Sequence, residues 1–276
     1  MSLITFPALL ATGCSGGTDD AATAGSNPWG ACLPTRAGTT EERPAGASGG
    51  GFFRVSLFPV GASLNGEWTT IAGRFSSYAS YPYCSRVTYG DCSVVKCPSP
   101  PGAGEMHPSG GTLSLTAGEK RLDAMPGPSG EYAGGAQGAV FAPGDLITAS
   151  MPGGAVPGFS VAVRAPAGGA LTSPQPGTTA TLAACTPLTV SWQPVPDGRA
   201  TIHLSGDQAT VECQSPAASG SFTVPAEALA LALVGEDPRA TVSVQISNEA
   251  EVDAAGWRTT VIASAEEGSF LVRTAR

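Results

Sequence analysis

Glycine and proline divide this 276-residue chain into short segments, because 37 glycines and 24 prolines recur along its length. The segments between them alternate apolar with polar side chains, so that Leu188, Val190 and Trp192 fall on one face. A period of two is typical of half-buried β-strands. Residues 225–233 differ, since a proline opens them and Gly235 follows, which predicts a helix. With 42% hydrophobic residues for a core, the pattern predicts an all-β fold.

The predicted strands form two groups on either side of residues 166–177, which are rich in proline and glycine. Residues 68–75 fit either a strand or a short helix. The first group is 52–58, 68–75, 85–89, 92–96, 111–116, 139–141, 145–150 and 159–164, and the second is 188–192, 200–204, 210–213, 220–224, 241–246, 259–262 and 269–272. This number and spacing of strands favours two antiparallel β-sandwiches.

The N-terminus has the layout of an export signal. Residues 1–13 carry no charge and are mostly apolar, but they are too few to span a bilayer. Ala11-Thr12-Gly13-Cys14 resembles the cleavage site of bacterial lipoproteins, with Leu10 one position early. The resemblance implies that Cys14 carries the lipid, and that Ser15 after it directs the protein to the outer membrane. A plain cleaved signal peptide, or a frayed terminus with a chance cysteine, is the alternative.

The sequence therefore predicts five regions. Residues 15–51 are mainly small and polar, which favours a disordered tether. The predicted regions are a lipoprotein signal peptide (1–13), a lipidated flexible tether (14–51), a first β-sandwich with a cysteine hairpin (52–165), a Pro/Gly linker (166–177) and a second β-sandwich (178–276).

Six cysteines remain once Cys14 is assigned to the lipid, and an even number in an exported chain favours three disulfides. A two-residue turn at Gly90-Asp91 would pair strands in which Tyr89 faces Cys92 and Cys84 faces Cys97. That geometry predicts a Cys84–Cys97 bond. Position in the second half of the chain predicts Cys185–Cys213, which leaves Cys32 with Cys92. Zinc binding by Cys84, Cys92 and Cys97 is the alternative, but His107 does not follow a zinc-finger spacing.

The charge distribution argues against some partners. The net charge is −8, and residues 178–276 alone hold eleven acidic and five basic side chains. Since no basic patch exists, nucleic acid and anionic lipid are not expected as partners. The acidic half is expected to be a solvated surface.

A search for catalytic or metal-binding groups finds no complete set. The two histidines, His107 and His203, stand apart in sequence, and no cofactor-binding motif occurs. Glu249, Glu251 and Asp253 are predicted to share one face of a strand. A solvated face is the main interpretation; calcium binding or a glycosidase pair are the alternatives.

Tyrosines gather around the cysteine hairpin. Tyr78, Tyr81 and Tyr83 are candidates for a ligand-binding surface, whereas Tyr89 is expected to pack inward beside Cys92. The alternative is that these side chains merely line a loop.

The second group of strands resembles a known class of domain. Leu188-Thr189-Val190-Ser191-Trp192-Gln193-Pro194, with Asp197-Gly198 before the next strand, is similar to the buried-tryptophan strand of fibronectin type III domains. Together with the lipoprotein signal, the layout resembles uncharacterised bacterial surface lipoproteins with immunoglobulin-like or fibronectin-like sandwiches.

The resemblance implies location and fold but no activity. We expect a non-enzymatic, outer-membrane binding or structural protein that needs no cofactor. Its expected partners are the membrane, through the lipid, and an unknown protein or glycan at the cell surface. A secreted hydrolase or carbohydrate-active protein that uses loop carboxylates is the alternative.

Overall fold

The computed structural model describes residues 28–34, 39–40, 49–58, 68–77, 85–96, 107–207, 209–234 and 238–275. In these residues the chain is mostly β-strand, so the predicted all-β class is confirmed. The predicted helix is also present, as α1 (Ala226–Leu233), and two 3₁₀ turns, η1 (Pro28–Cys32) and η2 (Ala217–Ser219), complete the helical structure described.

Most strands belong to one large sheet, in the order β1-β4-β5-β15-β14-β17-β18-β2-β3-β8, with β12 also paired to β18. Its strands are β1 (Thr39–Thr40), β2 (Gly49–Phe58), β3 (Trp68–Ser77), β4 (Ser85–Tyr89), β5 (Cys92–Lys96), β8 (Tyr132–Gln137), β12 (Thr179–Leu182), β14 (Arg199–Gly206), β15 (Thr210–Pro216), β17 (Arg239–Ala254) and β18 (Trp257–Thr274).

Two small sheets cover one side of the large sheet. The four-stranded sheet has the order β10-β9-β6-β7, and the three-stranded sheet has the order β11-β13-β16. Their strands are β6 (Leu113–Ala117), β7 (Lys120–Ala124), β9 (Leu146–Met151), β10 (Phe159–Arg164), β11 (Leu171–Ser173), β13 (Leu188–Trp192) and β16 (Ser221–Val224).

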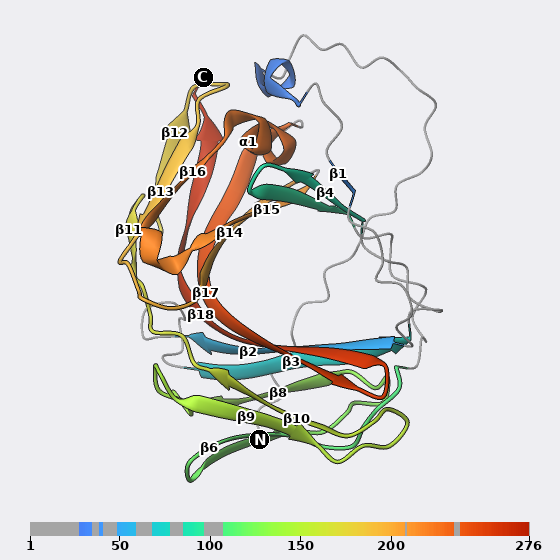
Figure 1. Cartoon of the computed structure of the whole chain (residues 1–276). Helices are drawn as coiled ribbons and strands as arrows, with labels where there is room; N and C mark the ends of the chain where they lie inside the picture. The colour runs from blue at the N-terminus through green and yellow to red at the C-terminus, as the bar shows by residue number, and fades with distance from the viewer. Residues whose placement is uncertain are drawn as a thin grey trace.

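The long β17–β18 hairpin connects the two halves of the large sheet. It runs from the region of β14 and α1 to the region of β2 and β3 and bends on the way, with the small sheets on the outer side of the bend (Figure 1). β18 was predicted as two separate strands, but it is continuous over Trp257–Thr274. The predicted strand at 139–141 is not formed, and residues 68–75 are a strand rather than a helix.

The buried side chains form two cores. The Trp192 core lies between the large sheet, α1 and the three-stranded sheet, and includes Trp192, Ile202 and Leu233. The Phe53 core lies between the large sheet and the four-stranded sheet. Within it Phe53 makes edge-to-face contacts with Phe75 and Tyr132, at 5.0 and 5.3 Å between ring centroids.

The two cores do not follow the predicted domain boundaries. Cys92 and Val94 of the hairpin, assigned to the first domain, pack in the Trp192 core. Val261 and Ala263, assigned to the second domain, pack in the Phe53 core. The physical reason is long-range pairing: β5 pairs with β15, and β2 pairs in parallel with β18, so strands of both predicted domains share one sheet.

The predicted tether also contains ordered structure. Trp29 of η1 is fully buried in the Trp192 core, and its indole Nε1 donates a hydrogen bond of 2.7 Å to Thr274 Oγ1. β1 pairs with β4, and β2 begins at Gly49. The prediction of a flexible segment throughout 14–51 is therefore wrong for these parts, because Trp29 supplies an apolar anchor that small polar neighbours do not reveal.

Candidate functional site

The disulfides differ from two of the predicted pairs. Cys32 is bonded to Cys185, and Cys92 is bonded to Cys213, so the predicted Cys185–Cys213 and Cys32–Cys92 pairs are wrong. The predicted hairpin register is confirmed, with Tyr89 opposite Cys92. However, this hairpin adds to the edge of β15, which places Cys92 directly opposite Cys213.

Several predicted site residues lie outside the described residues. These are the lipidation candidate Cys14, the Cys84–Cys97 pair and the candidate binding residues Tyr78, Tyr81 and Tyr83. Tyr89 is described, and it packs half-buried against the Trp192 core as predicted.

The acidic residues of β17 lie on the side of the sheet opposite the cores. Glu249, Glu251 and Asp253 are exposed, whereas Ala250 and Val252 between them pack against the Phe53 core. The prediction that the three carboxylates share one strand face is confirmed. They lie side by side on an open surface, which is not the arrangement of two carboxylates facing each other across a substrate.

An exposed aromatic ring lies in the same rows of the sheet. Phe52 on β2 is 46% exposed, although its neighbour Phe53 is fully buried in the core. Register places Glu251 opposite Thr260, Thr260 beside Phe52, and Phe52 opposite Arg74. We call Phe52, Arg54, Arg74, Glu251 and Thr260 the Phe52 surface.

Sequence reasoning missed Phe52 as a surface residue. The sequence did contain a signal for an exposed aromatic residue. Adjacent side chains of a strand point to opposite faces, so Phe52 and Phe53 cannot both enter one core. The burial of Val55 and the charge of Arg54 identify Phe53 as the inward member.

Arg54 is the most perturbed cation of this surface. Its guanidinium carbon lies 5.7 Å from the centroid of the Phe52 ring, in cation–π geometry. Its Nε is buried and has no hydrogen-bond partner. Burial lowers the pKa of Arg54, and the carboxylate of Glu212 partly opposes that change. Arg54 remains a cation, because a guanidinium does not deprotonate at physiological pH.

Hydrogen bonds and ion pairs extend from this surface. Thr260 Oγ1 donates to Glu251 Oε1 at 3.4 Å, and Arg199 Nη2 lies 3.7 Å from Glu249 Oε1. At the other end, Arg74 Nη1 lies 3.7 Å from Glu131 Oε1. These contacts hold charged side chains in place along the sheet.

Both histidines lie next to a glutamate. His203 Nδ1 lies 3.5 Å from Glu212 Oε1, on neighbouring strands β14 and β15. His107 Nε2 lies 3.9 Å from Glu131 Oε1, and its backbone N–H donates to Ser129 O at 2.8 Å. The first pair lies on strands of the large sheet and the second lies outside the strands, before β8, so the two do not form one catalytic set.

The bulge in β18 places a carboxylate between the two cores. Gln245 pairs with Glu266 and Val244 with Gly268, so Glu267 has no partner on β17. The Glu267 carboxylate accepts a hydrogen bond from the Gly169 backbone, but its Oε1 is buried without a partner. Burial raises the pKa of Glu267 to about 7, and it also raises the pKa of Glu266.

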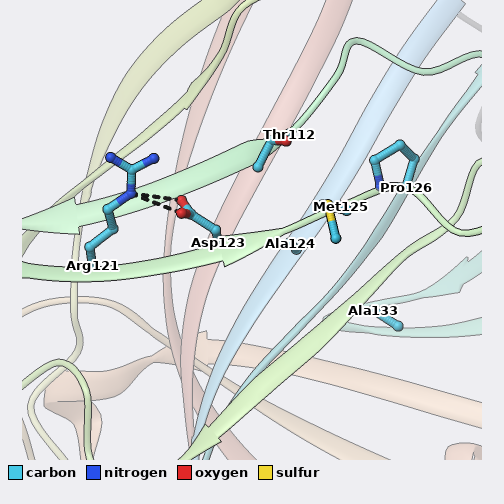
Figure 2. A pocket seen from close by; sticks show the side chains of 7 residues that line it. All are labelled: Thr112, Arg121, Asp123, Ala124, Met125, Pro126 and Ala133. Atoms are coloured by element: carbon cyan, nitrogen blue, oxygen red, sulfur yellow. Dashed lines mark hydrogen bonds and ion pairs between the residues drawn. The ribbon is translucent and has the colours of Figure 1, made fainter.

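An open hollow lies where β7 ends beside β8 (Figure 2). Arg121 Nε donates to both carboxylate oxygens of Asp123 at 2.9 Å, and these bonds lower the pKa of Asp123. A carboxylate kept ionised in this way does not suit a general acid. The hollow is lined by Thr112, Arg121, Asp123, Ala124, Met125, Pro126 and Ala133.

Neither a metal-ligand cluster nor a membrane-spanning helix occurs among the described residues. In the described part of the chain, no group of three or more His, Cys, Asp or Glu side chains has the geometry to hold a metal ion. The helices described are likewise too short or too polar to cross a membrane.

Comparison with known proteins gives few relatives. No protein-family model and no curated protein matches the chain. A solved structure of a Ca²⁺-stabilised, ice-binding adhesin from an Antarctic bacterium aligns with 82% of this chain at 16% identity and a TM-score of 0.21. A second, from a 1.5-MDa bacterial ice-binding adhesin, aligns with 81% at 12% identity and a TM-score of 0.20. The chain spans 49% and 65% of those two structures.

Proposed function

We propose that this chain is an exported, lipid-anchored protein that binds a partner or builds structure outside the cytoplasm. The export part rests on the disulfides Cys32–Cys185 and Cys92–Cys213, which favour an oxidising compartment. The lipid is proposed on Cys14, and the outer membrane is the proposed site of anchoring.

One observation favours binding. Both cores lie on the same side of the large sheet, so its other face carries the exposed Phe52 and a row of charged side chains. Exposed aromatic side chains on a rigid sheet supply contact area at little cost in conformational entropy. A protein or a glycan at the cell surface is the proposed partner.

We infer that each core corresponds to one β-sandwich unit of the immunoglobulin or fibronectin type III class. The fully buried side chain of Trp192, whose Nε1 donates to Ala217 O at 2.8 Å, supports this for the second unit. The units would then be joined by the β17–β18 hairpin instead of a linker.

Amine labelling of intact cells tests the location. The chain has only two lysines, and the side chain of Lys120 is 45% exposed. A membrane-impermeant amine reagent should modify Lys120 in intact cells, or after the outer membrane alone is opened, and Lys120→Arg should abolish that modification. Labelling of Lys120 only after the inner membrane is broken would contradict the proposal.

A further inference from the structure

The Phe52 ring is open on one side. On β2, Gly50 and Arg54 lie two residues before and two residues after Phe52, on the same face of the sheet. Arg54 covers the ring from its own side. Gly50 has no side chain that could cover the ring from the other side, which agrees with the 46% exposure of Phe52.

The side chains of β3 on either side of the ring's row are small. Ser76 lies opposite Gly50, and Ala72 lies opposite Arg54 on β3. A planar ligand can therefore lie against the Phe52 ring and still contact the polar groups of neighbouring strands. Among the side chains of β2 whose burial is described, Phe52 is the one large apolar group exposed on this face. In the next row Ile262 of β18, beside Arg54, is half-buried.

The charges around the ring balance over the neighbouring rows. Register pairs place Glu249 in one row with Arg54 and Glu251 in the next row with Arg74. In the third row, Asp253 lies opposite Arg258. With Arg199 beside Glu249 and Glu131 beside Arg74 at the ends, the rows together hold four acidic and four basic side chains. Such a surface has little net field to attract an anion or a cation, but many hydrogen-bond donors and acceptors.

The strand pairing argues against a peptide as the ligand. β2 is hydrogen-bonded to β18 on one side and to β3 on the other, so it offers no free edge to which a peptide strand could add. A protein partner would also be expected to find several exposed apolar anchors, whereas the described neighbours of Phe52 on this face are mostly polar and the nearby Ile262 is half-buried.

The exposed ring, the balanced charges and the paired strands together favour an uncharged ligand with a flat face and many hydroxyl groups. We propose that the Phe52 surface binds a neutral oligosaccharide, which stacks one sugar ring on Phe52 and hydrogen-bonds to Glu251, Thr260 and Arg74. From Glu251 to Arg74 the surface spans three strand spacings, about 14 Å, which suits several sugar units. This inference rests on the proposed binding function and names the ligand of that same face.

The test uses the full chain in a detergent without a sugar head group. Saturation-transfer NMR measures binding of four neutral hexasaccharides, namely the α-1,4 and β-1,4 glucose, the mannose and the N-acetylglucosamine hexamers. The acidic galacturonate hexamer serves as a comparison. Phe52→Ala, Phe52→Trp and the control Leu146→Ala are measured alongside. Leu146 is also an exposed apolar residue, 54% exposed, but it lies on β9 away from the Phe52 surface.

We expect at least one neutral hexamer to bind. Phe52→Ala should weaken that binding about tenfold, since it removes the stacking area, whereas Phe52→Trp and Leu146→Ala should retain it. Binding by the acidic hexamer alone, binding by no hexamer, or equal binding by Phe52→Ala would overturn the inference. Labelling of Lys120 in cells reports the proposed location independently, so failure of the ligand class leaves that result standing.

Discussion

Replacing Glu267 by glutamine should stabilise the protein at neutral pH. The carboxylate lies at the β18 bulge between the two cores, with Oε1 buried and unpartnered. Its pKa is raised from 4.5 to about 7 by burial. Because the folded state holds the proton more tightly than the unfolded chain, the unfolded state gains relative stability as pH rises from 4.5 to 7.

The size of the effect follows from the pKa shift. At about 1.4 kcal/mol per pKa unit, a shift of this size costs the folded state at most about 3.5 kcal/mol above pH 7, and little below pH 4.5. Partial contact of the carboxyl group with solvent reduces that figure to roughly 2 kcal/mol. Glutamine keeps the shape and an acceptor for the Gly169 N–H but carries no charge.

Urea unfolding of the oxidised protein at pH 4 and pH 8 measures this difference. Glu267→Gln should raise the free energy of unfolding by roughly 2 kcal/mol at pH 8 and change it little at pH 4. Glu249→Gln, at an exposed carboxylate, is the matched control and should have little effect at either pH. An equal gain at both pH values, or no gain at pH 8, would refute the reasoning.

Three further changes can be measured by the same urea assay. The double variant Cys92→Ser/Cys213→Ser opens a bond between residues 121 apart in sequence and should cost about 2 to 5 kcal/mol; an unchanged midpoint would exclude this bond from the native protein. Gly206→Ala should cost roughly 1 to 3 kcal/mol or more, because the new Cβ would overlap the Ala232 carbonyl oxygen, while Gly30→Ala, with open space around it, should be neutral. Trp192→Phe should cost about 1 to 3 kcal/mol, since the buried Ala217 carbonyl loses its indole donor; a cost no larger than that of an exposed substitution would contradict this.

Local features of the fold could be predicted from the sequence. The Gly90-Asp91 turn fixed the register of β4 with β5, and Tyr89 does face Cys92. Pro225 and the apolar residues after it correctly located α1. In β17 the alternation of Glu249, Glu251 and Asp253 with apolar residues correctly gave one exposed face. Each of these depends on residues close together in the chain, where turn chemistry and side-chain periodicity act directly.

Long-range pairing could not be predicted in this way. Nothing in the periodicity of β2 indicates that it lies parallel to β18, about two hundred residues away in sequence. That pairing, together with β5 beside β15, mixes the two predicted domains and decides which cysteines meet. The Phe52 surface depends on the same pairing, because Glu251 and Arg74 come from strands that only the sheet brings together.

Intact mass of the membrane-extracted protein, before and after reduction and with mapping of the cysteine peptides, tests the proposed export most directly. We predict a mature chain that starts at Cys14, carries acyl mass, and yields the linked peptides Cys32–Cys185 and Cys92–Cys213. A chain without acyl mass, or one with free thiols at those four cysteines, would contradict an exported, lipid-anchored binding protein.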